Sequence, residues 1–580
     1  MPCTRPLHGM VALPIVLLGL GCLNADQATA PEVAPSPPIT AAVTTPVGFT
    51  WGAGTPESQG MCGTTLQLGC TRTLLDIWTS IADPKYNTMR FIVIRNDRVI
   101  YDRGGTLAYP AYSSNKGLLG APTLVHAMSS CGVRLTDRAS RWLAAGDGAR
   151  WGTAYPWTDI TIEHLATHTS GVCDYENTSL VCRNQNTGWQ QAFEHAKSGG
   201  TKWPYPKDAL TIARAKAEAN REPAAPPGTV LEYSNVGHAL LNYAVQQACG
   251  RKLSDIYAQY IKQAGMGLPV EPALIYTDNG KIWNQSAGIA RWKGRDGAAV
   301  LRLASRLGIW DNRNVEPVRY WNEVTRITDN AVAAAAGRGV VYTNNSTDTW
   351  TRSAGHRRLS AELFGHNGNF STVFLTDPLT GTTIVRQGKN NATGASYLTR
   401  NGCQPGWTGT APTCTPGTDW SNNWGVAQDS QDSPNIASRT MVMDPVQEAF
   451  FFPPPFCRMS VAAGTTVDKV TDVYDSPAGA TTIELTAEIR INPREGNGSS
   501  EVDRVEFFKE DGSGVPRLVG VGTLVEGSDP AQYQVSYAAD DHGTPGTVMT
   551  YFANCVARSV EDPTKVVPAY SRPVRVRRGS

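Results

Sequence analysis

Ser113 and Lys116 are the residues whose chemistry and spacing stand out first in this 580-residue sequence. Because they are three positions apart, a helix that starts near Ser113 would place both side chains on one face, one turn apart. A lysine in that position can accept the serine proton if burial or a neighbouring charge keeps its amine neutral near pH 7. The helix start would also offer backbone N–H groups to an oxyanion. The pair therefore indicates nucleophilic attack on a carbonyl, although a solvated helix start has the same spacing.

Two further motifs follow along the chain. Tyr233 and Asn235 form Tyr-x-Asn shortly after a Pro-Pro-Gly turn signal. His366 and Gly368 form His-x-Gly just before residues 370–375, whose alternating pattern is typical of a strand. In this order, Ser-x-x-Lys, Tyr-x-Asn and His-x-Gly resemble the signature of the serine β-lactamase and penicillin-binding-protein superfamily. The sequence is most similar to its class C-related branch of esterases, D-aminopeptidases and nylon-oligomer hydrolases.

Three other stretches carry the same resemblance. Residues 162–171 (IEHLATHTSG) resemble the LLTHTSG segment of that branch, and residues 227–235 (PGTVLEYSN) resemble its PGT-x-x-x-YSN segment. Residues 295–299 (RDGAA) are similar to its RDLAR helix. Together these matches cover about residues 57 to 400. The resemblance implies an α/β, β-lactamase/transpeptidase-like fold, in which an antiparallel sheet is flanked by helices and joined to an all-α lobe.

The resemblance also implies a role for each catalytic residue. Ser113 would attack an ester or amide carbonyl and form an acyl-enzyme. Lys116 would help to remove the serine proton, and Tyr233 would share that task and protonate the leaving group. For Tyr233 to act as a base its pKa must fall, which the nearby Lys116 charge would achieve. The simpler interpretation of Tyr233 is a packed tyrosine at the end of a strand.

The remaining site residues would bind and orient. Asn235 would hydrogen-bond Lys116 or the substrate, and the backbone N–H groups of Ser113 and Asn369 would form the oxyanion hole. Gly368 has no Cβ, so the backbone there can approach the substrate closely. His366 replaces a lysine that β-lactamases and D,D-peptidases often carry, although a surface turn histidine would look the same. Because a neutral imidazole binds a carboxylate less firmly than a fixed cation, His366 favours esters or less charged amides as substrates.

One departure from the family pattern lies directly after Lys116. Gly117, Gly120 and Pro122 fall where the nucleophile helix should continue. Glycine lowers helix propensity, and an interior proline costs about 3 kcal/mol and kinks a helix. We expect the first turn to survive and the helix behind it to be bent.

Three functions follow from these residues. The first is a serine hydrolase that cleaves a small-molecule or polymer ester or amide. The second is a β-lactamase or D-alanyl-D-alanine carboxypeptidase. The third is a non-catalytic surface binding protein whose hydrolase domain has lost activity, which the interrupted helix and an added C-terminal domain would suit. His164 and His168 have a spacing that suits zinc on a helix, but no His-Glu-x-x-His occurs and we interpret both as structural. No metal and no cofactor are expected.

Composition excludes some partners. Hydrophobic residues make up 41% and charged residues 18% of the sequence, and the formal net charge is +1. No basic stripe interleaved with aromatic residues is present, so we expect no nucleic-acid partner. The length indicates more than one domain.

Residues 1–30 have the pattern of an export signal. The apolar run at residues 10–21 is too short to span a bilayer and fits a secretory signal core. Alternatively, residues 18–22 resemble a lipobox that would make Cys22 a lipid-anchored residue. The Ala/Pro/Thr-rich residues 31–56 would then form a flexible tether. We expect an exported protein, either secreted or anchored to the cell envelope as a lipoprotein.

The cysteines agree with export. Of the 12 cysteines, Cys3 and Cys22 belong to the signal region, which leaves 12 − 2 = 10. An even number suits disulfides in an oxidising compartment, whereas the competing metal site lacks a Cys-x-x-Cys. Proximity in the sequence suggests three local pairs and two long-range pairs: Cys62–Cys70, Cys173–Cys182, Cys403–Cys414, Cys131–Cys249 and Cys457–Cys555.

After the hydrolase domain at residues 57–400 the composition changes. Residues 401–456 are expected to be a cysteine-containing linker, because they begin with a stretch rich in Gly, Pro, Thr, Asn and Ser. Residues 457–580 contain short alternating runs separated by turns, which predicts a small all-β sandwich. Residues 502–512 (VDRVEFFKEDG) resemble bacterial immunoglobulin-like modules. Such a module would serve spacing or surface attachment.

Overall fold

The computed structural model describes most of the chain beyond its first 48 residues. All described residues belong to one compact unit, Val43–Ser580. No helix among them is both long and apolar enough to cross a membrane. The described ranges are 49–67, 69–83, 86–143, 157–172, 225–266, 275–278, 281–284, 291–335, 339–344, 359–360, 362–368, 372–388, 442–461, 466–468, 473–491, 500–512 and 515–579.

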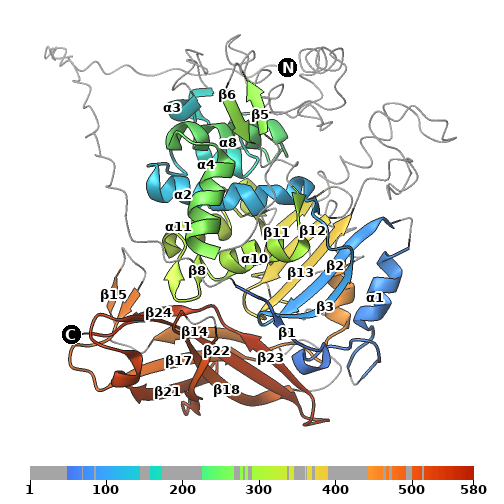
Figure 1. The fold of residues 1–580 in the computed structure, drawn as a ribbon, viewed down its shortest axis with the longest axis vertical. Coiled ribbons are helices and arrows are strands. Elements are labelled where there is room, and N and C mark those ends of the chain that lie inside the picture. Colours follow the sequence, from blue (N-terminus) through green and yellow to red (C-terminus); the bar gives the residue numbers. More distant parts are fainter. Residues whose placement is uncertain are drawn as a thin grey trace, which may run out of the picture. The chain divides into compact units, whose positions relative to one another are not determined.

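A seven-stranded sheet forms the centre of the N-terminal region, in the order β1-β3-β2-β13-β12-β11-β10 (Figure 1). All neighbours pair antiparallel except β1 and β3. The strand expected at residues 370–375 is confirmed from residue 372 on, and β2 and β3 form a hairpin. Along the chain the strands are β1 (Gly52–Ala53), β2 (Thr88–Arg95), β3 (Arg98–Gly104), β10 (Thr343–Asn344), β11 (Phe364–Gly368), β12 (Thr372–Asp377) and β13 (Thr382–Gly388).

Both faces of this sheet are covered, because successive side chains of a strand point to opposite sides. In β2, Ile92 and Ile94 pack into the large core shared with the helical lobe. Phe91 and Val93 of the same strand pack into a second core with α1 (Leu74–Ile81) and the residues around α15 (Asp444–Glu448). The expected antiparallel sheet flanked by helices is therefore confirmed.

The helical lobe lies on the first of these faces (Figure 1). Its apolar centre includes Trp292 and Trp321, which are fully buried. The helices of this part of the chain are α2 (Ala121–Ser130), α3 (Ser140–Leu143), α4 (Ile162–Ala166), α8 (Asn235–Cys249), α9 (Leu253–Ile256), α10 (Gly294–Ser305), α11 (Val318–Thr325) and α12 (Ala331–Ala335), with the π-helical turns η4 (Lys116–Gly120) and η6 (Tyr257–Met266) and the 3₁₀ turns η1 (Glu57–Gln59), η3 (Tyr112–Ser114) and η5 (Trp157–Asp159). Short strand pairs connect them: β4 (Tyr109–Pro110) with β7 (Arg291–Trp292), β5 (Ile275–Asp278) with β6 (Lys281–Asn284), and β8 (Ile309–Trp310) with β9 (Arg313–Asn314).

The C-terminal region is a two-sheet β-sandwich, as predicted. Alternate residues of β17 (Thr482–Arg490), such as Ile483 and Leu485, point into its core. One sheet has the order β14-β17-β21-β20, with β14 (Phe456–Val461), β20 (Thr523–Leu524) and β21 (Gln532–Ala538). The other has the order β15-β16-β24-β22-β18-β19 with β23 beside β22, and its strands are β15 (Thr466–Asp468), β16 (Val473–Asp475), β18 (Ser500–Glu510), β19 (Arg517–Val521), β22 (Val548–Ser559), β23 (Val566–Tyr570) and β24 (Val574–Arg577). The 3₁₀ turn η10 (Ala539–His542) follows β21.

The structure contains three of the five predicted disulfides: Cys62–Cys70, Cys131–Cys249 and Cys457–Cys555. The Cys457–Cys555 bond joins β14 in one sheet of the sandwich to β22 in the other. The predicted pairs Cys173–Cys182 and Cys403–Cys414 lie outside the described residues.

The sandwich is packed against the seven-stranded sheet. Val567 of β23 joins the same buried cluster as Met61 and Val93. The buried guanidinium of Arg95 donates to the carbonyl oxygen of Pro568, and the amide nitrogen of Tyr570 donates to Asn96 Oδ1 at 2.8 Å. The C-terminal region therefore buries part of the surface of the N-terminal region.

Candidate active site

The segment that carries Ser113 is helical but irregular. A 3₁₀ turn holds Tyr112 and Ser113, a π-helical turn begins at Lys116, and regular α-helix begins only at Ala121. Pro122 falls in the first turn of α2, where a backbone N–H has no intrahelical partner to lose. The interruption predicted from the glycines and the proline is therefore present, as a change of helix type within a continuous helical path.

The glycine after Lys116 has a packing reason. A Cβ on Gly117 would lie 2.8 Å from the Tyr342 ring, and the Tyr342 hydroxyl donates to the Gly117 carbonyl oxygen at 3.0 Å. The ring therefore occupies the space that a side chain would need. Tyr112 has a φ of 49°, which is uncommon for a residue with a Cβ and places strain directly before Ser113.

Ser113, Lys116 and Tyr233 form a triangle of hydrogen bonds. The Tyr233 hydroxyl donates to Ser113 Oγ at 2.6 Å. Lys116 Nζ donates to the Tyr233 oxygen at 2.5 Å and lies 3.3 Å from Ser113 Oγ. The Lys116 side chain is completely buried, so its ammonium has lost its hydration and depends on these neighbours. The geometry allows a proton to pass between all three groups.

Asn235 is the fourth residue that the structure brings to this cluster. Its Oδ1 accepts a hydrogen bond from Lys116 Nζ at 2.8 Å. It is the first residue of α8, and the side chain of the preceding Ser234 caps that helix by accepting from Gly237 N. The helix start therefore fixes Asn235, which in turn orients the lysine.

Strand β11 passes along the other side of Ser113. A Cβ on Gly368 would lie 2.5 Å from the Ala111 carbonyl oxygen and 3.2 Å from Ser113 N, so only glycine allows this approach. The Ser114 hydroxyl donates to the His366 carbonyl oxygen at 2.8 Å. The His366 side chain is buried, and its Nδ1 lies 2.7 Å from the Asn367 carbonyl oxygen. Asn369, the second predicted oxyanion donor, lies outside the described residues.

Two histidines behind the cluster were not predicted as part of it. Burial, followed by the charges of Lys116 and His366, lowers the pKa of His238 well below its ordinary value. The ring of His168 lies against that of Tyr233, with 4.5 Å between ring centroids. His168 was interpreted as structural, and nothing in the spacing of residues 162–171 points to Tyr233. A single residue in a distant segment leaves no periodic signal in the sequence.

A second layer holds the helix that carries the nucleophile. Trp292 Nε1 donates to Asn115 Oδ1 at 2.9 Å, and Gln387 Nε2 donates to the Trp292 carbonyl oxygen at 2.9 Å. Asn115, Trp292 and Gln387 are all buried. Asn115, which lies between Ser113 and Lys116 in the chain, is therefore connected to the central sheet through Trp292 of β7 and Gln387 of β13.

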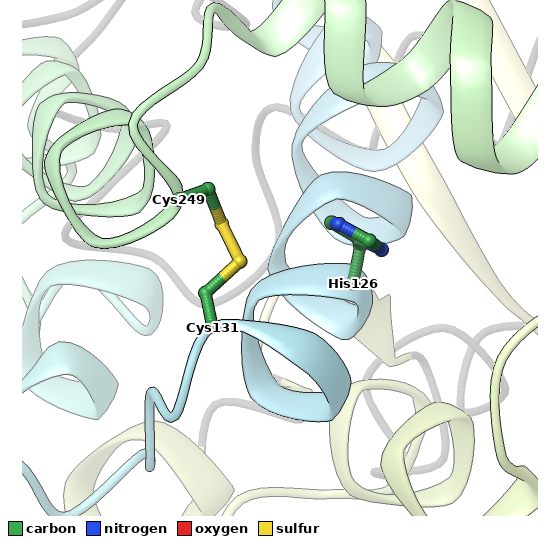
Figure 2. A group of neighbouring side chains, drawn as sticks. All are labelled: His126, Cys131 and Cys249. Atoms are coloured by element: carbon green, nitrogen blue, oxygen red, sulfur yellow. A yellow bond between two sulfur atoms is a disulfide. The ribbon is translucent and has the colours of Figure 1, made fainter. Parts of the chain in front are cut away.

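The described residues contain one group with metal-ligand geometry, away from this cluster: His126, Cys131 and Cys249. Figure 2 shows the imidazole beside the Cys131–Cys249 disulfide. Both sulfurs are bonded to each other and offer no thiolate, and His126 Nδ1 lies 2.6 Å from Glu316 Oε1. The trio in this form is a disulfide beside a histidine that is hydrogen-bonded to a glutamate.

His164 and His168, which the sequence spacing raised as possible zinc ligands, both use Nδ1 for the backbone. His164 Nδ1 accepts from Thr161 N at 3.3 Å, and His168 Nδ1 accepts from Ser234 N at 3.2 Å. The two rings are therefore held by different segments.

The Beta-lactamase family model matches residues 80–392, which is more than half of the chain. A search of curated proteins found no match.

Similar solved structures include a D-stereospecific amidohydrolase from Streptomyces sp. (19% identity, 53% of this chain and 91% of that chain, TM-score 0.37). They also include a penicillin-binding protein homologue from Caulobacter crescentus (12% identity, 54% and 90%, TM-score 0.38). A third is an octameric penicillin-binding protein homologue from Pyrococcus abyssi (13% identity, 82% and 96%, TM-score 0.38). These likenesses are too remote to indicate a substrate.

The family match spans both Ser-x-x-Lys and Tyr-x-Asn as well as strand β11. On this match the chain belongs to the beta-lactamase family of serine hydrolases.

Proposed function

We propose that this protein cleaves an ester or an amide through an acyl-enzyme on Ser113. The observation that carries the proposal is the position of the Tyr233 hydroxyl, 2.6 Å from Ser113 Oγ and 2.5 Å from Lys116 Nζ. An ammonium at that distance favours the phenolate, which is the form that can take the serine proton.

The proposed reaction has two halves. As Ser113 Oγ attacks the carbonyl carbon, its proton passes to Tyr233, and the carbonyl oxygen becomes an oxyanion near Ser113 N–H. The bond to the alcohol or amine then breaks, and Tyr233 returns the proton to that leaving group. In the second half a water molecule attacks the acyl-enzyme and gives its proton to Tyr233. Tyr233 passes that proton to Ser113 Oγ as the bond between Oγ and the acyl group breaks and the acid leaves.

Lys116 and Asn235 support this cycle without bonding to the substrate. The Lys116 ammonium favours the phenolate form of Tyr233, and its 2.8 Å hydrogen bond to Asn235 Oδ1 keeps it directed at the phenol and the serine. The buried position of the ammonium strengthens its effect on both neighbours, because little water screens it.

The test is intact-mass spectrometry after incubation with a fluorophosphonate or a penicillin, with Ser113→Ala as the control. We expect one adduct, absent from Ser113→Ala. Labelling by the fluorophosphonate together with hydrolysis of a short p-nitrophenyl ester supports the proposal. Turnover of a chromogenic cephalosporin above that of the ester would instead identify a β-lactamase or D-alanyl-D-alanine carboxypeptidase. No adduct on folded protein would identify a non-catalytic binding protein.

We further propose that the protein is exported. The support is the apolar run at residues 10–21 in the sequence and the three disulfides of the structure, which persist in an oxidising compartment. The mass of the mature protein would separate a secreted chain starting near residue 31 from a lipid-modified chain starting at Cys22. An uncleaved chain recovered from the cytoplasm would overturn the proposal.

A further inference from the structure

We infer that His168 is a positioning residue for Tyr233: it holds the phenol at Ser113 through a neutral imidazole that accepts a backbone hydrogen bond. The inference rests on the proposed function, because it assigns a role around the same tyrosine. His168 belongs to the LATHTSG segment, 65 residues before Tyr233 in the chain (233 − 168), so only the fold brings the two together.

His168 contacts the residues on both sides of Tyr233 as well as Tyr233 itself. Its carbonyl oxygen accepts from Glu232 N at 2.8 Å, and its Nδ1 accepts from Ser234 N at 3.2 Å. Its ring lies 4.5 Å from the Tyr233 ring, at an interplanar angle of 34°. One residue therefore fixes the backbone before and after the phenol and one face of its ring.

The segment around Tyr233 has no regular secondary structure that would fix it otherwise. Residues 230–234 lie in neither a helix nor a strand. The carbonyl oxygen of Thr169, the residue after His168, accepts a hydrogen bond from Gly228 N at 2.7 Å. Three hydrogen bonds from residues 168–169 thus hold residues 228–234, and two of the three are made by His168.

The backbone of His168 lies in a conformation that the surrounding structure must hold. Its φ is 62°, in the left-handed region that glycine and asparagine adopt more easily than histidine. Strain of this kind persists when the surroundings demand that residue. The demand visible here is an acceptor nitrogen at Ser234 N and a flat ring against Tyr233.

The hydrogen bond defines the charge of the imidazole. A backbone N–H can only donate, so Nδ1 must lack a proton, and an added proton would break the bond to Ser234 N. Three titratable groups lie around the His168 ring. Tyr233 lies against it, and the His238 ring lies 6.2 Å away between ring centroids. Lys116 Nζ lies 4.8 Å from the centroid of the Tyr233 ring. Glu232 adjoins His168 through the backbone bond. Protonation of His168 would therefore release Tyr233 and add a charge near Lys116, which predicts a loss of activity on the acid side.

Two variants separate the parts of this role. His168→Ala removes both the acceptor and the ring, whereas His168→Asn keeps an acceptor oxygen near the position of Nδ1, tolerates the positive φ and cannot take up a proton. With p-nitrophenyl acetate as substrate, we expect His168→Ala to lower kcat by about 100-fold with KM within about threefold, because misplacement by about 1 Å has that effect. His168→Asn should recover at least about tenfold of that loss and should lose the acid limb that His168 causes.

His164→Asn is the matched control. His164 makes the same kind of Nδ1 bond to a backbone N–H, but this N–H belongs to Thr161, three residues earlier, and not to the segment that carries Tyr233. It should leave kcat and the pH profile unchanged. The rate of Ser113 labelling by the fluorophosphonate gives a second readout that needs no substrate. It should fall in His168→Ala and partly recover in His168→Asn.

The outcomes distinguish this inference from the proposed function. Full activity in Ser113→Ala overturns the proposed function and the inference with it. Loss of activity in Ser113→Ala together with wild-type kcat in His168→Ala overturns the inference alone. If His168→Ala does not fold, folded His168→Asn decides: an acid limb identical to that of wild type overturns the inference, and a lost limb supports it.

Discussion

Two buried cations in this protein have opposite surroundings. Lys116 is 0% exposed and Arg306 is 7% exposed. The Lys116 amine is hydrogen-bonded to the side chains of Ser113, Tyr233 and Asn235, which are uncharged in their ordinary states. The Arg306 guanidinium instead contacts the Glu510 carboxylate at 2.6 Å. A carboxylate stabilises a buried cation, whereas an ammonium hydrogen-bonded to a phenol and a serine hydroxyl acts on the protonation of those groups.

The arginine region joins the two parts of the chain. Arg302 of α10 binds Asp97 through two bonds of 2.7 Å, and Arg306 links the same helix end to Glu510 on β18 of the sandwich. Burial raises the pKa of Glu510, and Arg306 and Arg302 counteract part of that effect. Burial would also raise the pKa of Asp97, but Arg302 and Arg306 hold it below its ordinary value. Here the charges serve structure, and at Lys116 they serve the proposed chemistry.

The largest expected effect follows from Lys116→Met. We expect ester turnover and Ser113 labelling to fall by about 10³-fold or more, because Tyr233 loses the ammonium that makes it an effective general base. The unfolding free energy should stay level or rise, because a buried ammonium is replaced by an apolar chain. Turnover, labelling rate and urea unfolding measure the three quantities. Lys565→Met, which removes a bond to Gln67 far from Ser113, is the control. A stable variant with unchanged labelling would contradict the comparison.

The converse test is Glu510→Gln in the arginine region. It leaves Arg306 without its carboxylate, and removal of one partner of a buried ion pair costs about 3–5 kcal/mol of stability. Labelling of the folded fraction should stay as in wild type. Glu501→Gln on the same strand breaks a half-exposed pair with Arg558 and should cost about 1 kcal/mol or less. Urea unfolding of both variants measures the difference. Equal losses of stability in the two variants would mean that the buried Arg306–Glu510 pair stabilises the fold no more than the half-exposed pair does.

Much of the active site and of the fold could be predicted from the sequence. What could not be predicted has a physical reason. Ser113 with Lys116, and Tyr233 with Asn235, are local motifs, and the family resemblance that their order carries predicted that they meet. Alternating apolar residues likewise predicted β12 and the strands of the sandwich. The proline at position 122 predicted a break, but whether a turn becomes π-helical or bent depends on the Tyr342 ring that packs on it.

The contacts that escaped prediction are single long-range pairs. Arg306 and Glu510 are 204 residues apart, and Trp292 and Asn115 are 177 residues apart. Each depends on one side chain from each of two distant elements, and no spacing or period in the chain records such a meeting. His168 belongs to the same class, because its segment was recognisable while its partner was not.

A smaller effect tests the covalent link behind the active site. Cys131 follows α2 and Cys249 ends α8, so their disulfide joins the far ends of the two helices that lead away from Lys116 and Asn235. Its sequence separation is 118, against 8 for Cys62–Cys70. Loop entropy then predicts that Cys131→Ser/Cys249→Ser loses about 2 kcal/mol more stability than Cys62→Ser/Cys70→Ser. Urea unfolding measures this difference, and a larger loss from the short pair would show that chain entropy does not govern it.

The smallest expected effect concerns the pH dependence of stability, and it tests the buried His238 in the active-site region. His238 is 1% exposed, and burial, reinforced by the charges of Lys116 and His366, lowers its pKa well below 6.5 in the folded state. Burial lowers the pKa of His164 and His542 in the same direction. Since the unfolded chain takes up protons first as the pH falls, the unfolded state gains stability below about pH 6.5.

The unfolding free energy should therefore be level above about pH 7 and decrease toward pH 5, by up to about 1.4 kcal/mol per pH unit for His238 alone. His238→Gln should be flatter over this interval, with its largest gain relative to wild type at the acid end. Urea unfolding at several pH values between 5 and 8 measures the slope. His542→Gln, in the sandwich, is the companion variant, because its effect should add to that of His238→Gln. If the unfolding free energy of His238→Gln depends on pH as steeply as that of wild type, the proton is taken up at another residue. The active-site region would then keep its charges over this pH range, as the arginine region does.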